Sequence, residues 1–227
     1  MFQSLKSLKE LVFPKACISC FEPQFWLCPS CLGGWNTNLK KSSIEGKPIY
    51  FKSDYTRKTA SVILAAKEGN DLNAIALLAS AISESIVFST LDLRVNGIIT
   101  LITIPSSTSA IRRRGRDHIN ILAQHVLKNL EEKSITAYYA PILFQKKSTK
   151  DQSALSSRQR MENTKGNFVV KSCEIPQGAI YLIDDLITTG ASMLEGVRAL
   201  SEAKISIAAG VTAVSYTHLT LPTICSV

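Results

Sequence analysis

Residues 179–193 read AIYLIDDLITTGASM, and this segment constrains the fold more than any other. It opens with a short apolar run, which is typical of a buried parallel strand. Two acids, two threonines, a glycine and a serine follow, and the residues after Gly190 have a helical pattern. Exposed amides at a helix N-terminus form an anion site. The sequence therefore predicts a strand, a loop and a helix start that bind a phosphate.

The residues of this loop divide by physical task. Gly190 lets the backbone turn and approach an anion closely, while the neighbouring hydroxyl groups donate hydrogen bonds. The carboxylates of Asp184 and Asp185 would repel a phosphate, so we expect them to face sugar hydroxyls or a hydrated magnesium ion. An ordinary strand-to-helix turn explains a capping threonine or serine but not two adjacent acids. The pattern therefore predicts a phosphorylated ribose as the ligand.

Strands alternate with helices along most of the chain, which predicts an α/β fold with a parallel sheet. Apolar runs predict strands at 97–104, 138–144, 168–170, 179–183 and 205–214, and helical periodicity predicts helices at 118–130 and 191–203. Another helix is expected after Asn70 or Asp71, either of which would cap it. The apolar stripe of this helix consists of Ile75, Leu78, Ala79, Ile82 and Ile86.

The strand predicted at 97–104 ends at a small polar loop, and a run of arginines follows this loop. Ligands of open parallel sheets bind at the carboxyl ends of the strands, so this loop is a candidate polyanion site. The alternatives for the arginines are a solvated loop or a nucleic-acid patch. The ligand-binding residues predicted here are Pro105, Ser106, Ser107, Arg112, Arg114 and Arg116.

Two Cys-x-x-Cys pairs lie close together near the N-terminus, and they contain Cys17, Cys20, Cys28 and Cys31. Four thiolates at this spacing suit one tetrahedral zinc ion. A disulfide pair or an iron–sulfur cluster is the alternative, but a reducing compartment favours a metal over disulfides. Four protein ligands leave no open position for a substrate, so we expect the zinc to be structural.

The net charge of +8 and the pI near 9.2 favour anionic partners, whether nucleic acid, a phosphorylated metabolite or an acidic membrane surface. The N-terminus has no long apolar core, so we expect no secretory signal. No uninterrupted apolar run approaches the roughly 18 residues that a spanning helix needs. The sequence therefore predicts a soluble cytoplasmic protein.

The acidic loop resembles the phosphoribosyl-pyrophosphate (PRPP) motif of the type I phosphoribosyltransferases, in which two acids and two variable residues precede Thr-Thr-Gly. Beyond this motif, the chain from about residue 10 to 214 resembles the ComF family (competence protein F, or amidophosphoribosyltransferase-like). The resemblance is carried by the two cysteine pairs, Tyr55, Lys67-Glu68-Gly69, Ile104-Pro105, Arg114-Gly115-Arg116-Asp117-His118, Gln152, Leu155, Arg158, Arg160, Asn163, Gly166 and Phe168.

The resemblance implies that PRPP binds at the carboxyl ends of the strands and carries Mg²⁺ on its pyrophosphate. It implies that the 5-phosphate is held by Thr188, Thr189, Gly190, Ala191 and Ser192. Asp184 and Asp185 would lie near the ribose hydroxyls as the catalytic pair. The implied reaction displaces pyrophosphate at the anomeric carbon in favour of an unnamed acceptor. Thr188 stands where purine-salvage relatives have an aspartate base, which disfavours a purine acceptor.

The ComF resemblance also implies a second function, because that family is associated with DNA uptake. The chain would then be a non-catalytic accessory protein that binds DNA or competence-machinery proteins through the zinc knuckles and basic loops. For the domains, we expect a zinc module and linker at 1–47 and a phosphoribosyltransferase domain at 48–214. The residues at 215–227 do not continue the strand pattern and are interpreted as a non-native tail. The polar stretch at 145–167 predicts a functional lid, and a disordered insertion without a role is the alternative.

Overall fold

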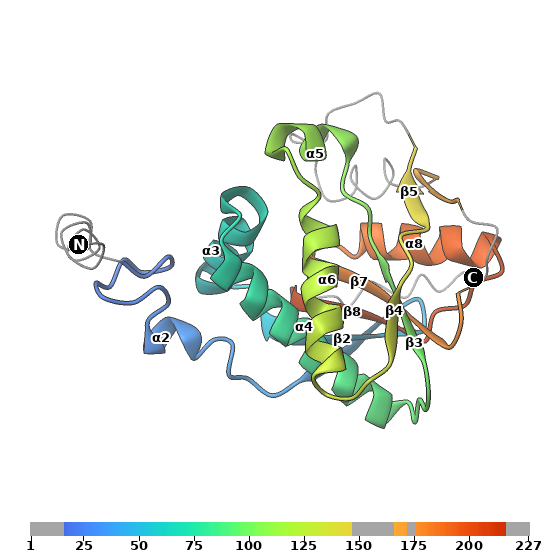
Figure 1. Ribbon diagram of the computed structural model, residues 1–227, viewed down its shortest axis with the longest axis horizontal. Coiled ribbons are helices and arrows are strands. Elements are labelled where there is room, and N and C mark those ends of the chain that lie inside the picture. The colour runs from blue at the N-terminus through green and yellow to red at the C-terminus, as the bar shows by residue number, and fades with distance from the viewer. Residues whose placement is uncertain (1–15, 147–165, 172–175, 217–227) are drawn as a thin grey trace, which may run out of the picture.

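The computed structural model describes residues 16–146, 166–171 and 176–216 of the chain. Within them, six strands form one sheet in the order β1-β2-β8-β7-β3-β4 (Figure 1). The strands are β1 (Lys40–Ile44), β2 (Lys47–Asp54), β3 (Ile99–Thr103), β4 (Ala137–Tyr139), β7 (Ala179–Ile187) and β8 (Ala209–Ser215). β1 is antiparallel to β2, and each of the other neighbouring pairs is parallel. The predicted α/β fold with a mostly parallel sheet is confirmed.

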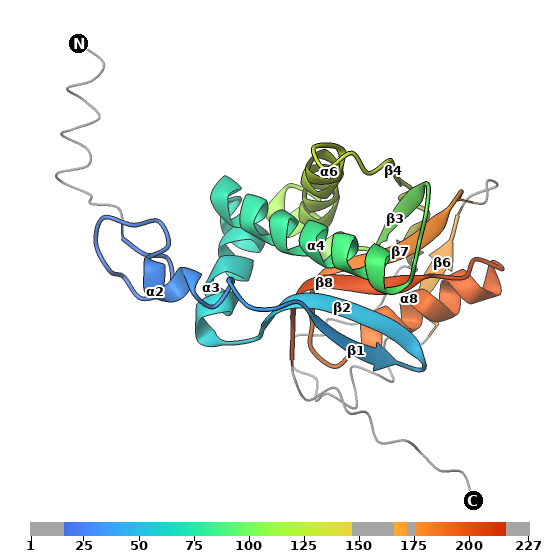
Figure 2. The same ribbon diagram turned by 90° about the horizontal axis from the view of Figure 1, so that it is seen from below.

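Helices cover both faces of the sheet. α4 (Leu72–Asp92) and α6 (His118–Glu131) lie on one face and α8 (Ala191–Glu202) lies on the other, as Figure 2 shows. The remaining helical elements are α2 (Pro29–Leu32), α3 (Arg57–Leu64), the π-helical turn η1 (Ala65–Gly69) and α5 (Thr108–Arg114). Strand side chains alternate between the faces, so the sheet contributes to two apolar cores, one under α4 and α6 and one under α8.

α4 is the central core helix of the first face. Its predicted stripe is buried at every position, and the predicted cap is Asp71, whose Oδ1 accepts hydrogen bonds from Asn73 N at 2.9 Å and Ala74 N at 3.0 Å. By length and composition α4 could cross a membrane, a test that buried core helices of soluble proteins also pass. Its apolar side contacts β2, β8 and α6, so burial in this protein accounts for its composition.

The bounds of some predicted strands differ from the sequence-based expectation. β7 continues past the predicted end at residue 183 to Ile187, because β8 pairs with it as far as Ile187, whereas the pairing with β3 ends at Ile183. The strand predicted at 138–144 is interrupted at Pro141, which has no N–H to donate. Its second half is β5 (Leu143–Gln145), which pairs with β6 (Phe168–Val170) in a separate sheet.

The last part of the segment predicted as zinc module and linker, 1–47, contains the edge strand β1. A tight turn joins β1 to β2, and its residues Glu45 (φ 47°) and Gly46 (φ 75°) have the left-handed backbone that two-residue hairpins require. The four-cysteine segment is joined to the main domain by Trp26, whose Nε1 donates to Asp71 Oδ2 at 2.8 Å, and by Ser53, whose Oγ donates to Gly34 O at 2.9 Å. Most of the predicted lid, 147–165, and the tail from 217 onward lie outside the described residues.

Gly178 fixes the start of β7, and replacing it with alanine is expected to destabilise the protein. Its φ is +74°, and a Cβ there would lie 2.0 Å from the backbone oxygen of Ile98. The left-handed conformation and the backbone clash together are expected to lower the free energy of unfolding by about 2 to 3 kcal/mol. Chemical denaturation measures the change. The matched control is Gly33→Ala, where the nearest atom is 3.5 Å away, and an equal loss in both variants would contradict the explanation.

Candidate functional site

The loops after β3 and β7 meet at the carboxyl edge of the sheet. Because these two strands are parallel neighbours, with Thr103 paired to Ile183, both chains leave the sheet on the same side. A pocket of about 240 Å³ lies there. The residues predicted from sequence that line it are Pro105, Ser106, Ser107, Arg114, Asp184 and Ser192. The structure thus brings the two predicted loops, which are far apart in sequence, to one cavity.

The predicted phosphate loop enters α8 through Gly190. This residue has φ 76° and ψ −4°, a left-handed conformation that glycine adopts without a steric penalty. α8 begins at Ala191, whose backbone N–H donates to Thr189 Oγ1 at 3.4 Å. Thr188 is exposed and Ser192 faces the pocket. The first amides of a helix have no partner within it, so this end of α8 presents donors to an anion.

Asp184 is half-buried and lines the pocket. Its Oδ1 accepts a hydrogen bond from the backbone N–H of Asp185 at 2.9 Å. Burial and the negative charge of Asp185 raise the pKa of Asp184 to about 8, although the charge of Lys67 acts in the opposite direction. A ligand that supplies hydroxyl donors or a cation would stabilise this carboxylate.

Asp185 has a different environment. It is 1% exposed, and its Oδ2 lies 2.8 Å from Lys67 Nζ and 3.2 Å from His118 Nε2. Burial by itself would raise the pKa of Asp185, but the charge of Lys67 and the hydrogen bond from His118 lower it far below the usual range. Asp185 is therefore an ionised group inside the protein with two partners on one oxygen.

His118 connects the acid to the loop after β3. Its Nδ1 lies 3.0 Å from Arg114 Nη1 and 3.2 Å from Ser106 Oγ. A guanidinium only donates hydrogen bonds, so Nδ1 accepts, and Nε2 carries the proton that is donated to Asp185. This assignment follows from the hydrogen-bond network. The network couples the β7 acid to the β3 loop through one buried imidazole.

Sequence reasoning did not predict Lys67 or His118 as site residues, and both line the pocket. Lys67 lies on the turn η1, far from the acidic loop in sequence, so no local pattern connects the two. The signal that was present is the Lys67-Glu68-Gly69 segment of the family resemblance. For His118, the signal was the Arg114-Gly115-Arg116-Asp117-His118 segment of the same resemblance, whereas its spacing along α6 showed only that it opens a helix.

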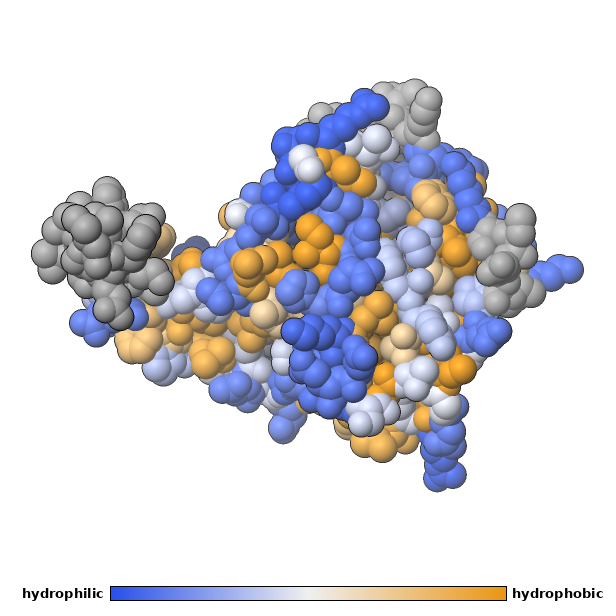
Figure 3. Space-filling view, viewed as in Figure 1, coloured by the Kyte–Doolittle hydropathy of each residue, from blue (hydrophilic) through white to orange (hydrophobic). Residues whose placement is uncertain are grey.

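The predicted arginines separate into three environments around α5, where strongly hydrophilic residues gather on the surface (Figure 3). Arg114 lines the pocket, and its Nε lies 2.9 Å from Glu68 Oε1. Arg116 donates through Nη2 to the backbone oxygen of Lys67 at 3.0 Å and so supports η1. Arg112 is exposed. Of the three, Arg114 is thus the one that lies at the cavity.

The four N-terminal cysteines gather at one point. Their sulfur atoms all lie within 4.8 Å of one another, and Cys20 Sγ and Cys28 Sγ are 3.5 Å apart. Four sulfurs at about 2.3 Å from one tetrahedral ion would be about 3.8 Å apart, which fits this arrangement. Burial raises the pKa of Cys17, but backbone N–H donors, chiefly that of Cys28, bring it down to about 6. The cluster could hold a metal ion.

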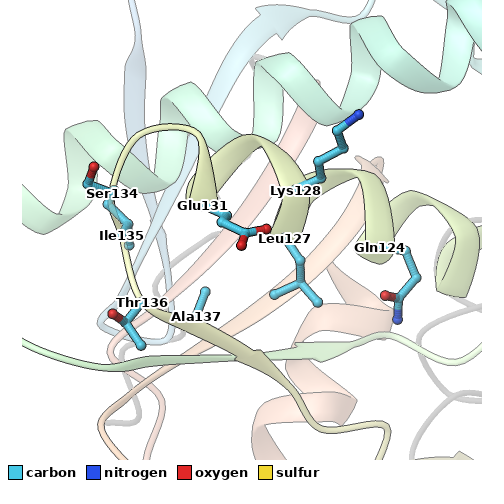
Figure 4. A pocket seen from close by; sticks show the side chains of 8 residues that line it. All are labelled: Gln124, Leu127, Lys128, Glu131, Ser134, Ile135, Thr136 and Ala137. Carbon is cyan, nitrogen blue, oxygen red and sulfur yellow. The ribbon is translucent and has the colours of Figure 1, made fainter.

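A second pocket of about 610 Å³ lies at the opposite edge of the sheet (Figure 4). It is formed by the last turns of α6, with Leu127 and Lys128, and by the approach to β4, with Ile135 and Thr136. This is the amino end of β4, so it lies away from the loops that carry the predicted ligand-binding residues.

No protein-family model and no curated protein matches the chain. Among solved structures, it resembles adenine phosphoribosyltransferase from Saccharomyces cerevisiae (10% identity, TM-score 0.38, 83% of this chain and 89% of that chain). It also resembles orotate phosphoribosyltransferase from Aeropyrum pernix (14%, 0.34, 81% and 76%) and adenine phosphoribosyltransferase from Leishmania tarentolae (9%, 0.38, 78% and 94%). All three are phosphoribosyltransferases. Because these TM-scores are below 0.5, the function is inferred from the residues of this chain.

Proposed function

We propose that the chain is a cytoplasmic, ComF-like phosphoribosyltransferase that binds PRPP and transfers its phosphoribosyl group to an acceptor. The observation that carries the proposal is the convergence of two loops on one cavity. Asp184 and the Gly190 loop reach it from β7, and Ser106 and Ser107 reach it from β3. PRPP has a diol, a phosphate and a diphosphate. The cavity offers a carboxylate for the diol, a helix N-terminus for the phosphate and nearby cations for the diphosphate.

Different residues of the cavity would bind different parts of PRPP. Thr188 to Ser192 would hold the 5-phosphate through backbone amides and hydroxyls. Asp184 would accept hydrogen bonds from the ribose hydroxyls. Ser106 and Ser107 would contact the pyrophosphate, with Arg114 beside them at the same cavity. Mg²⁺ prefers carboxylate and phosphate oxygens, so Asp184 and the pyrophosphate suit it, and it would neutralise charge on the leaving group.

The reaction would be a displacement at the anomeric carbon. The bond from this carbon to the pyrophosphate oxygen breaks, the bond to the acceptor forms, and pyrophosphate leaves with the electron pair. Positive charge develops on the ribose in such a reaction while negative charge develops on the leaving group. Carboxylates near the sugar and cations near the pyrophosphate lower the barrier by stabilising both.

The cysteine cluster would hold a structural zinc ion. Four thiolates complete a tetrahedral shell, and the cluster lies in the same apolar core as Trp35 and Val62. The zinc would therefore hold the N-terminal segment against α3 rather than take part in the reaction.

The alternative function, binding of DNA or competence proteins through the basic loop, has less support. Arg114 and Arg113 contact Glu68, and Arg116 contacts the backbone of η1. These contacts with the protein itself compete with phosphate contacts along a DNA backbone. The charge of +8 remains compatible with any anionic ligand.

Calorimetry with PRPP and Mg²⁺ tests the proposal. We expect the wild-type protein to bind PRPP and Asp184→Asn to bind it at least about tenfold more weakly, because the ribose hydroxyls lose an acceptor that can ionise when the ligand binds. The matched control is Glu131→Gln, which removes one carboxylate at the opposite edge of the sheet and should leave the affinity unchanged. Absence of binding by the wild type, or equal affinity in both variants, would refute the proposal.

A further inference from the structure

The two adjacent acids of β7 cannot serve one ligand in the same way. Up to Ile183, successive side chains of β7 point to opposite faces of the sheet. Beyond it, Asp185 contacts Lys67 of η1 and His118 of α6 on the α4 and α6 face. Asp184 lines the pocket, and Asp185, at 1% exposure, lies behind it.

Two donors already share Oδ2 of Asp185. Lys67 Nζ approaches it at 2.8 Å from η1, and His118 Nε2 approaches it at 3.2 Å from α6. Both donors line the pocket although their acceptor does not. An ammonium has three N–H donors, so Lys67 can bond to Asp185 and still offer donors to a ligand. Asp185 therefore affects a ligand in the cavity indirectly, by holding Lys67.

The backbone around Lys67 is also held in place. Lys67 lies in the π-helical turn η1, a rare conformation that is frequent at functional sites. Arg116 Nη2 donates to the backbone oxygen of Lys67 at 3.0 Å, and Glu68 is paired with Arg114 at 2.9 Å. The side chain of Lys67 is 27% exposed and so remains accessible from the cavity. These contacts fix a cation beside Ser106 and Ser107, the predicted pyrophosphate loop.

We propose that Lys67 binds the diphosphate group of the ligand and that Asp185 is a positioning residue that holds Lys67 there, so that Asp184 alone serves the ribose hydroxyls. This inference rests on the proposed PRPP function for the identity of the ligand. It differs from the sequence-based expectation, in which both acids approach the ribose.

Asp185 could contact the ribose or position Lys67. Inorganic pyrophosphate distinguishes these two roles, because it contains the diphosphate group and lacks the ribose. Calorimetry with Mg²⁺ is carried out on the full chain with Lys67→Met, Asp185→Asn and the double variant. Lys67→Met is expected to weaken pyrophosphate binding at least about tenfold. Asp185→Asn is expected to weaken it by about fivefold in the wild-type background and to have no effect in the Lys67→Met background.

Control variants separate this effect from general damage to the fold or charge. Lys128→Met removes the same charge at the amino edge of the sheet, where Lys128 lines the pocket in Figure 4, and should bind pyrophosphate like the wild type. Lys67→Arg keeps the cation beside Asp185 and should retain most of the affinity. Circular dichroism of each variant at the assay temperature identifies unfolded protein, and a folded Lys67→Arg variant keeps the test available if Lys67→Met unfolds.

The outcomes are distinguishable. If Asp185 contacts the ribose, Asp185→Asn weakens PRPP binding equally in both backgrounds and leaves pyrophosphate binding unchanged, which overturns this inference alone. If the wild type binds pyrophosphate with the expected pattern but does not bind PRPP, the inference about Lys67 stands and the proposed function fails. If the wild type binds neither ligand, both are wrong.

Discussion

Removal of the zinc ion that we propose for the four-cysteine cluster is expected to unfold the N-terminal segment and to lower the melting temperature of the protein by about 10 °C or more. Structural zinc contributes about 10 to 16 kcal/mol in isolated zinc-binding peptides, and each kcal/mol is worth about 2 to 4 °C in a domain of this size. The effect should reach the main domain because Cys17, Cys28 and Cys31 belong to the same apolar core as α3 and α4. Metal analysis followed by calorimetric melting with and without a strong chelator measures it.

Tryptophan fluorescence gives a local measure of the same event. Trp35 is 3% exposed and Trp26 donates to Asp71 Oδ2 at 2.8 Å, so loss of the segment's structure should shift the emission of both to longer wavelength. Cys28→Ser should reproduce the effect of the chelator. Cys173→Ser, which leaves both Cys-x-x-Cys pairs of the sequence intact, should not. Purified protein with less than about half an equivalent of zinc, and with melting insensitive to the chelator, would contradict the structural zinc site.

Local sequence patterns predicted the parts of the fold that local chemistry determines. Asp71 caps α4 because its carboxylate accepts hydrogen bonds from free amides of the first turn, and Gly190 marks the start of α8 because its backbone is left-handed. The cysteine cluster was predictable because its ligands lie within a short segment of the sequence. In each case the residues that cooperate are near one another in the chain.

Interactions between distant segments could not be predicted in this way. β7 extends through both acids because β8 pairs with it as far as Ile187, and in the packed structure Asp184 lines the pocket whereas Asp185 is buried. The ion pair of Asp185 joins a strand to the turn η1 from the other half of the chain. A run of arginines indicated anion binding, but only the packed structure shows Arg116 occupied with the backbone of Lys67.

Asp185→Ala is expected to lower the free energy of unfolding by about 3 to 5 kcal/mol, which is the usual cost of breaking a buried ion pair. The carboxylate is 1% exposed, and its loss leaves Lys67 and His118 without their shared acceptor. Asp184→Ala is the matched control, since burial raises the pKa of Asp184 to about 8 and its ionised form therefore does not stabilise the fold. Urea denaturation of both variants at neutral pH should show a large loss for Asp185→Ala and little or none for Asp184→Ala.

The stability difference between wild type and Asp185→Ala should depend on pH in one direction. The pKa of Asp185 is lower in the folded protein than in the unfolded chain, because the charge of Lys67 and the hydrogen bond from His118 outweigh the effect of burial. The stability that Asp185 contributes is therefore fully present above the unfolded pKa of about 4 and is lost as the pH falls toward the folded value. The gap in unfolding free energy between wild type and Asp185→Ala should narrow below about pH 4. A gap that widens with acid, or an equal loss in Asp184→Ala, would show that Asp185 is not the internal counter-ion of Lys67.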